Sequence, residues 1–154
     1  MAIDYSRIPS DASPVEILTA ASKLKTKKEK IELLRQYEKH PGLMHILRGA
    51  YADNVEWLLP EGDLPAGVVP SAAVSVDTAE DRLIRAFRQF QYLVKGGADV
   101  KQAKREEIYL NLYRSLHSSE AELLKSIVQK KLPYKGITKK LVAEAFPNVW
   151  NEPV

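Results

Sequence analysis

The hydrophobic positions in the first part of the chain repeat with the spacing of an α-helix, and helix-start signals precede them. Ser13 followed by Pro14 is typical of an N-cap and a first helical position. Thr26 and Glu29 have the spacing of a capping box, in which the two side chains cap each other's backbone amides. A further segment with helical periodicity follows at 43–59. The pattern therefore predicts three helices in this part of the chain.

The character of the chain changes at residues 60–76, PEGDLPAGVVPSAAVSV. Three prolines and two glycines in seventeen residues predict an internal loop. The only stretch with a strand-like alternation, GVVPSAAVSV, lies here and is interrupted by a proline, which disfavours a strand. No β-sheet is expected.

A strongly amphipathic helix is predicted directly after this loop. Asp77 or Thr78 would cap its start. Gly96-Gly97 would end it, because glycine readily adopts the left-handed conformation at a helix C-terminus. Its apolar face follows the positions i, i+4, i+7 and i+11, which are Leu83, Phe87, Phe90 and Val94.

Three more helices are predicted in the last third of the chain. Asp99 would open the first, and the spacing from Ser119 to Glu122 would form a capping box for the second. Thr138 would cap a short last helix that ends at Phe146. Seven helices without strands indicate an all-α fold, a compact bundle of about seven helices.

The domain organisation follows from length and pattern. At 154 residues the chain is most simply one domain. We expect a helical domain at 13–150 with the internal loop at 60–76, a loosely ordered N-terminal arm at 1–12 and a C-terminal tail at 151–154.

The composition excludes several classes of protein. The chain has no cysteine, which excludes disulfides, thiolate metal sites and nucleophilic cysteine chemistry and fits a reducing cytoplasm. No apolar run reaches the roughly 18 residues of a membrane span, and the N-terminus has no signal-peptide core. We expect a cytoplasmic protein, in the host cell if it is viral, without a membrane partner.

The charges are segregated along the chain, although the net charge is only +3. Residues 43–78 carry five acids against Arg48, whereas residues 123–142 carry six lysines and no acid. A second basic run, KLKTKKEK at 23–30, has five lysines against Glu29. Such segregation favours a polyanionic partner, while the alternative is that the lysines solvate helix surfaces.

No catalytic constellation is visible in the sequence. The three histidines, His40, His45 and His117, share no metal-ligand spacing, and no phosphate-binding loop or nucleophile elbow occurs. Glu106 and Glu107 are adjacent on a helix and so point about 100° apart, which prevents a catalytic pair. We expect a protein that is not an enzyme, with no metal, no cofactor and no small-molecule substrate.

The stretch at 130–147, KKLPYKGITKKLVAEAFP, has the features of a phosphate-binding corner. Gly136 permits a positive φ, and Thr138 would cap a helix whose first amides point outward among lysines. The predicted phosphate contacts are Lys130, Lys131, Lys135, Gly136, Ile137, Thr138, Lys139 and Lys140. A possible secondary basic track consists of Arg82, Arg85, Arg88, Lys101, Lys104 and Arg105.

Residues 22–150 resemble the N-terminal all-helical DNA-binding domain of bacteriophage ATP-dependent DNA ligases. The best-defined match is ELLKSIVQKKLPYKGITKKLVAEAFPNV, which is similar to that domain's closing segment: an apolar helix, a turn of glycine, Ile or Val, and Ser or Thr, and a last helix. SKLKTKKEKIELLRQYEKHPGLMHILRGAY and DRLIRAFRQFQYLVKGG are similar to its opening and central helix pairs. The resemblance implies a helical fold and a duplex-binding surface. It does not imply ligation, because the chain ends at Val154 and lacks an adenylating Lys-x-Asp-Gly motif.

Two functions remain open from the sequence. The first is a non-catalytic, largely sequence-independent double-stranded DNA-binding protein, phage-encoded and accessory to replication or repair. The second is a protein–protein adaptor, binding a phage or host protein through the acidic region at 43–78. Trp57 and Leu58 would then be its contact residues.

Overall fold

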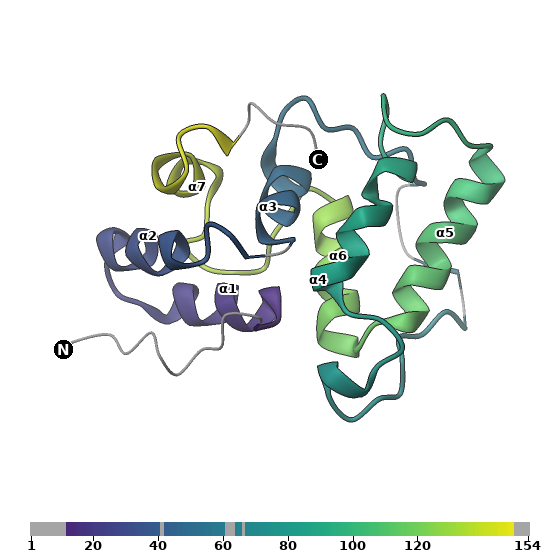
Figure 1. The fold of residues 1–154 in the computed structure, drawn as a ribbon, viewed down its shortest axis with the longest axis horizontal. Helices are drawn as coiled ribbons and strands as arrows, with labels where there is room; N and C mark the ends of the chain where they lie inside the picture. The colour runs from purple at the N-terminus through teal and green to yellow at the C-terminus, as the bar shows by residue number, and fades with distance from the viewer. Residues whose placement is uncertain (1–11, 41, 61–63, 66, 150–154) are drawn as a thin grey trace.

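The computed structural model describes residues 12–40, 42–60, 64–65 and 67–149. In this part of the chain it contains seven α-helices and no β-strand beyond two isolated bridges, so the predicted all-α fold is confirmed (Figure 1). The helices are α1 (Pro14–Lys23), α2 (Lys27–Gln36), α3 (Leu43–Tyr51), α4 (Leu83–Ala86), α5 (Gln102–Ser115), α6 (Ser118–Val128) and α7 (Lys139–Ala145). Two 3-10 helices, η2 (Val76–Thr78) and η3 (Phe87–Tyr92), flank α4.

The apolar faces of all seven helices meet in one hydrophobic core. Helices α1, α2 and α7 lie at one end of the molecule and α5 lies at the other, with α3 and α6 between them (Figure 1). α2 packs against α7, α3 against α6, and α5 against α6. The helices of the last third of the chain therefore lie at both ends of the molecule.

Three helix starts form as the local sequence predicts. The Ser13 hydroxyl accepts a hydrogen bond from the Val15 amide at the start of α1. The capping box of Thr26 and Glu29 is complete at the start of α2. At the start of α7, the Thr138 hydroxyl accepts from the Leu141 amide at 3.2 Å.

The helix predicted to begin at Asp77 or Thr78 begins later and is shorter. α4 starts at Leu83 and changes to the 3-10 helix η3 after four residues. The cause is tertiary, because the Leu83 amide donates to the Glu120 carboxylate of α6 at 3.0 Å. The apolar stripe is nevertheless in the core, with Phe90 fully buried.

Two other predicted caps are wrong. α5 begins at Gln102 and its N-cap is Lys101, two residues after the expected Asp99 cap. α6 begins at Ser118, and its cap is the His117 imidazole, whose Nδ1 accepts from the Ser119 amide at 3.2 Å.

The segment between α3 and α4 lies against the rest of the molecule. α3 ends at Tyr51, so residues 52–59 of the predicted helical segment are not helical. This segment is held by the Leu58 amide, which donates to Leu93 O at 2.8 Å, and by the Ser71 amide, which donates to Leu116 O at 2.9 Å. The described part of the predicted loop at 60–76 contains no α-helix.

The predicted arm at 1–12 and tail at 151–154 lie outside the described residues, except for Ala12, which is buried. No helix in the described ranges is long and apolar enough to cross a membrane.

Candidate nucleic-acid interface

The packing of α2 against α7 brings the two lysine runs of the sequence together. Lys30 of α2 lies directly over Gly136, where a Cβ atom would come within 2.7 Å of the Lys30 Cε atom. Gly136 has a φ of +80°, as the sequence predicts for this turn. The run at 23–30 therefore forms one surface with the corner at 130–140.

The backbone of this corner is fixed from beneath. The Tyr51 hydroxyl of α3 donates to Ile137 O at 2.6 Å, and the Ile137 side chain is buried. The Lys30 ammonium donates a hydrogen bond to Leu24 O, so this buried lysine is engaged with the backbone of the protein. Ile137 therefore anchors the turn in the core, whereas the adjacent lysines remain at the surface.

A small cavity marks the contact of the two runs. It has a volume of about 320 Å³ and lies between the starts of α2 and α7. Its lining residues are Lys27, Lys30, Gly136, Thr138, Lys140 and Leu141. Three lysines thus border one concave surface with no carboxylate among the lining residues.

The lysines of the corner divide into two groups. The side chains of Lys131, Lys135 and Lys140 are exposed and make no hydrogen bond or ion pair with the described part of the chain. Lys28 of the first run is exposed in the same way. These four side chains can take up an anion without giving up an existing contact.

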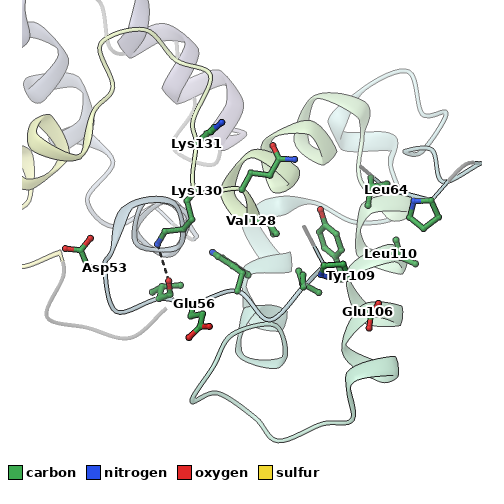
Figure 2. Close-up of a pocket in the computed structure, with 15 residues that line it drawn as sticks. Asp53, Glu56, Leu64, Glu106, Tyr109, Leu110, Val128, Lys130 and Lys131 are labelled. Atoms are coloured by element: carbon green, nitrogen blue, oxygen red, sulfur yellow. Dashed lines mark hydrogen bonds between the residues drawn. The ribbon is translucent and has the colours of Figure 1, made fainter. Parts of the chain in front are cut away.

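Lys130 is engaged within the protein instead. Its ammonium donates to Ala52 O at 2.6 Å and to Val55 O at 3.2 Å, and Figure 2 shows the bond to Val55. Burial lowers the pKa of Lys130, an effect that the Asp53 carboxylate opposes and the Lys139 ammonium supports. Lys130, one of the predicted phosphate contacts, therefore directs its ammonium group towards backbone carbonyls of the protein.

Two further lysines at this surface are paired with carboxylates. The Nζ atom of Lys139 lies 2.5 Å from the Oδ1 atom of Asp53. The hydrogen bond from Lys139 and its positive charge lower the pKa of the Asp53 carboxyl group. Lys27 lies 2.6 Å from Glu144. Both pairs are exposed, so water screens them and each contributes little to stability.

Only part of the predicted secondary track is exposed. Arg85, Arg88 and Lys101 are exposed, but Lys104 pairs with Glu107 at 3.6 Å. Arg105 is buried and donates to three acceptors: Tyr92 O, Val100 O and the Gln102 side chain. Arg82 is half-buried and has its own interactions. These residues lie on or beside α4 and α5, away from α2 and α7 (Figure 1).

The predicted protein-contact residues are partly used in packing. The Trp57 indole donates to Gly49 O at 2.8 Å and meets Phe90 edge-on, with 5.3 Å between ring centroids. Leu58 is half-buried. Trp57 also lines a larger cleft on the α5 side of the molecule.

The surface includes lysines that the corner motif alone does not identify. Lys27, Lys28 and Lys30 belong to the separate run at 23–30. The sequence shows that the run at 23–30 is rich in lysine, but it does not show that this run lies beside the corner, because that position depends on the packing of α2 against α7.

The fold and this surface define a small all-helical protein with a lysine-rich face at one end. The model of a family of unknown function, DUF6433, matches residues 17–134, and the chain belongs to that family. The match ends just before Lys135, so it includes the run at 23–30 but not the turn at 135–140. Comparison with curated proteins and with solved structures finds no significant match to either.

Proposed function

We propose that this protein is a non-catalytic DNA-binding protein that holds duplex DNA by its backbone phosphates. The observation that carries the proposal is the convergence of the two lysine runs on the face formed by α2 and α7. Lysines concentrated on one face of a helical fold provide the electrostatic footprint that binding to a nucleic acid requires.

The chemistry of this face favours phosphates over base edges. Lysine ammonium groups are mobile point charges, and contacts to phosphates position a duplex without reading its sequence. Binding should therefore be largely independent of sequence and steeply dependent on salt. The resemblance to the helical DNA-binding domain of phage ligases supports the same partner. It also supports a phage-encoded role accessory to replication or repair.

The two ion pairs at the face are compatible with this function. Lys27 and Lys139 are each held by an exposed carboxylate, and exposed ion pairs contribute only about 0–1 kcal/mol. A phosphate can therefore replace either carboxylate at low cost. Lys130 stays on its two carbonyl partners in this arrangement.

Fluorescence anisotropy with a labelled duplex tests the proposal. The wild type should bind a duplex of about 20 base pairs at about 50 mM salt and lose most of its affinity at about 200 mM salt. The variant Lys28→Glu/Lys135→Glu/Lys140→Glu removes three unengaged cations from the face. Its affinity should fall at least about tenfold, and its dependence of log K on log salt should become shallower by about 2.7, since each phosphate contact contributes about 0.9.

A matched control separates this face from general charge. Arg85→Glu/Arg88→Glu/Lys101→Glu makes the same change in net charge on exposed residues elsewhere. It should reduce affinity less than about threefold, because long-range repulsion is screened over about 10 Å. Equal losses in the two variants would place the interface elsewhere. The absence of salt-dependent duplex binding by the wild type would contradict the proposal and leave the protein–protein adaptor as the working hypothesis.

A further inference from the structure

A cleft of about 860 Å³ extends from the corner at 130–140 to α5. Lys130 and Lys131 line it on one side, and Glu106 and Leu110 of α5 line it on another (Figure 2). Much of the remaining lining is apolar and includes Val55, Trp57, Leu59, Leu64 and Val128. The volume lies within the range of about 300–1,000 Å³ that is usual for ligand sites, so the cleft has room for a bound group.

Three of the five charged residues that line this cleft are engaged within the protein. The Asp53 carboxylate is paired with Lys139 at 2.5 Å. The Glu56 carboxylate is paired with Lys95 at 3.8 Å. The Lys130 ammonium donates to two backbone carbonyls, as described above. These three groups already have partners and do not require a ligand.

The other two charged residues of the lining, Lys131 and Glu106, have opposite signs and no such engagement. Among the described residues, neither side chain makes a hydrogen bond or an ion pair. Lys131 is exposed and Glu106 is half-buried. Figure 2 shows the two side chains apart, with Val128 and Tyr109 between them in the view. The cleft therefore offers one cation and one anion on either side of an apolar surface.

This distribution of charge selects among the possible occupants. A nucleic-acid strand is a polyanion, and it would meet three carboxylates, those of Asp53, Glu56 and Glu106, along the lining. A neutral apolar molecule would leave both Lys131 and Glu106 without a partner. A peptide segment with an acidic residue at one end, apolar residues in the middle and a basic residue at the other end satisfies both charges and the apolar wall.

We propose that this cleft binds such a peptide segment of a partner protein. The acidic residue of the segment would lie beside Lys131, the basic residue beside Glu106, and the apolar residues against Trp57 and Val128. The Gln129 side chain, which also lines the cleft, can donate to and accept from peptide groups. Lys131 is shared with the lysine face, so a protein held here would lie beside DNA bound to that face.

Four capped hexapeptides with the common core Leu-Val-Pro-Leu test the proposal. Two mixed peptides carry glutamate at one end and lysine at the other, in the two possible orders, because the charges do not define the chain direction. An acidic peptide has glutamate at both ends, and a basic peptide has lysine at both ends. Each is titrated into nitrogen-15-labelled protein without DNA at about 150 mM salt, where charge effects are screened beyond about 8 Å.

The indole N–H signal of Trp57 reports binding in the cleft, and Trp150→Phe identifies this signal because the chain has only two tryptophans. One mixed peptide should shift it saturably and bind at least about threefold more tightly than the acidic and the basic peptides. The reason is that a mismatched end loses one exposed ion pair, which changes affinity by up to about fivefold.

Reversing either charge of the cleft should change which peptide binds best. In Lys131→Glu both unengaged charges are negative, so the basic peptide should bind most tightly. In Glu106→Lys both are positive, so the acidic peptide should bind most tightly. The matched controls are Lys135→Glu and Glu107→Lys, which make the same changes of charge on exposed residues that do not line the cleft. Both controls should keep the preference for the mixed peptide.

Three results would overturn the proposal. The first is the absence of a saturable shift of the Trp57 signal with either mixed peptide. The second is a wild-type protein that binds the acidic or the basic peptide as tightly as the better mixed peptide. The third is failure of either charge reversal to change the preference, or the same change in its control. Because no DNA is present, these results are independent of the outcome of the duplex-binding assay.

Discussion

Glu120 is the most consequential buried polar residue of the fold. It lies in the first turn of α6 with no exposed surface. Its carboxylate accepts hydrogen bonds from the Ser13 hydroxyl at 2.8 Å and from the Leu83 amide at 3.0 Å. One side chain therefore connects the start of α6 with the N-cap of α1 and the first amide of α4.

Removal of this carboxylate should destabilise the whole protein. Hydrogen bonds to a charged group contribute about 1.5–3 kcal/mol each, and Glu120→Ala leaves two buried donors without their acceptor. Relief from burying a charge offsets part of the loss, so we expect a decrease of about 3 kcal/mol in the free energy of unfolding. At about 2–4 °C per kcal/mol for a chain of this size, the melting temperature should fall by roughly 6–12 °C.

Glu120→Gln is the matched control, because it keeps the shape and removes the charge. Its amide oxygen can accept from Leu83, and its NH₂ group can donate to the Ser13 hydroxyl, which acts as donor or acceptor. This variant should lose about 1 kcal/mol or less. Urea unfolding followed by far-UV circular dichroism measures both variants. A loss below about 1 kcal/mol for Glu120→Ala, or equal losses for the two variants, would refute the hydrogen-bond explanation.

Three further predictions concern other elements. Gly97→Ala should lower the melting temperature more than Gly96→Ala. A Cβ atom at 97 would lie 2.0 Å from the Gln91 carbonyl oxygen of η3. A Cβ atom at 96 would meet nothing within 4 Å, so Gly96→Ala costs only the strain of a non-glycine residue at a φ of +84°. Asp53→Ala should tighten duplex binding by up to about fivefold in the anisotropy assay, since it releases Lys139 from an exposed pair. Burial, aided by Glu122, raises the pKa of Tyr113 from 10.0 to about 12, so the stability that it contributes below pH 10 should be lost as the pH rises towards 12. Urea unfolding at several alkaline pH values should show this loss, and Tyr113→Phe should reduce it.

The helix starts show which parts of the fold local sequence can predict. In the caps of α1, α2 and α7, the donor and the acceptor of the hydrogen bond are only two or three residues apart, so a short stretch of sequence contains both. Their geometry depends little on the rest of the chain.

The start of α4 depends on a partner that local sequence cannot indicate. Its first amide is satisfied by Glu120, which lies 37 residues further along the chain. Near the expected start, Ser75 is the N-cap of η2 and Thr78 is its last residue, and the two residues hydrogen-bond to each other. The capping residues predicted at 77–78 therefore belong to the short 3-10 helix η2, and α4 begins five residues later at Leu83.

The candidate site was predictable in its backbone and less so in its side chains. The sequence predicts the positive φ of Gly136 and the Thr138 cap, since both are local properties. The partners of Lys130 and Lys139 lie between 75 and 86 residues away along the chain, so their engagement depends on tertiary packing. For the same reason the sequence showed two lysine runs without showing that they form one face.

The engaged and unengaged basic residues of this face have different roles. Arg35 donates to the carbonyls of Glu144 and Ala145, which holds the end of α7 on α2, and Lys30 and Lys130 are likewise bonded to backbone carbonyls. These bonds fix the backbone from which the exposed lysines project. Binding a polyanion would then restrict only side-chain rotamers and would not require the corner to fold. The exposed ammonium groups can still adjust to phosphates along either strand, which supports binding that tolerates any duplex sequence.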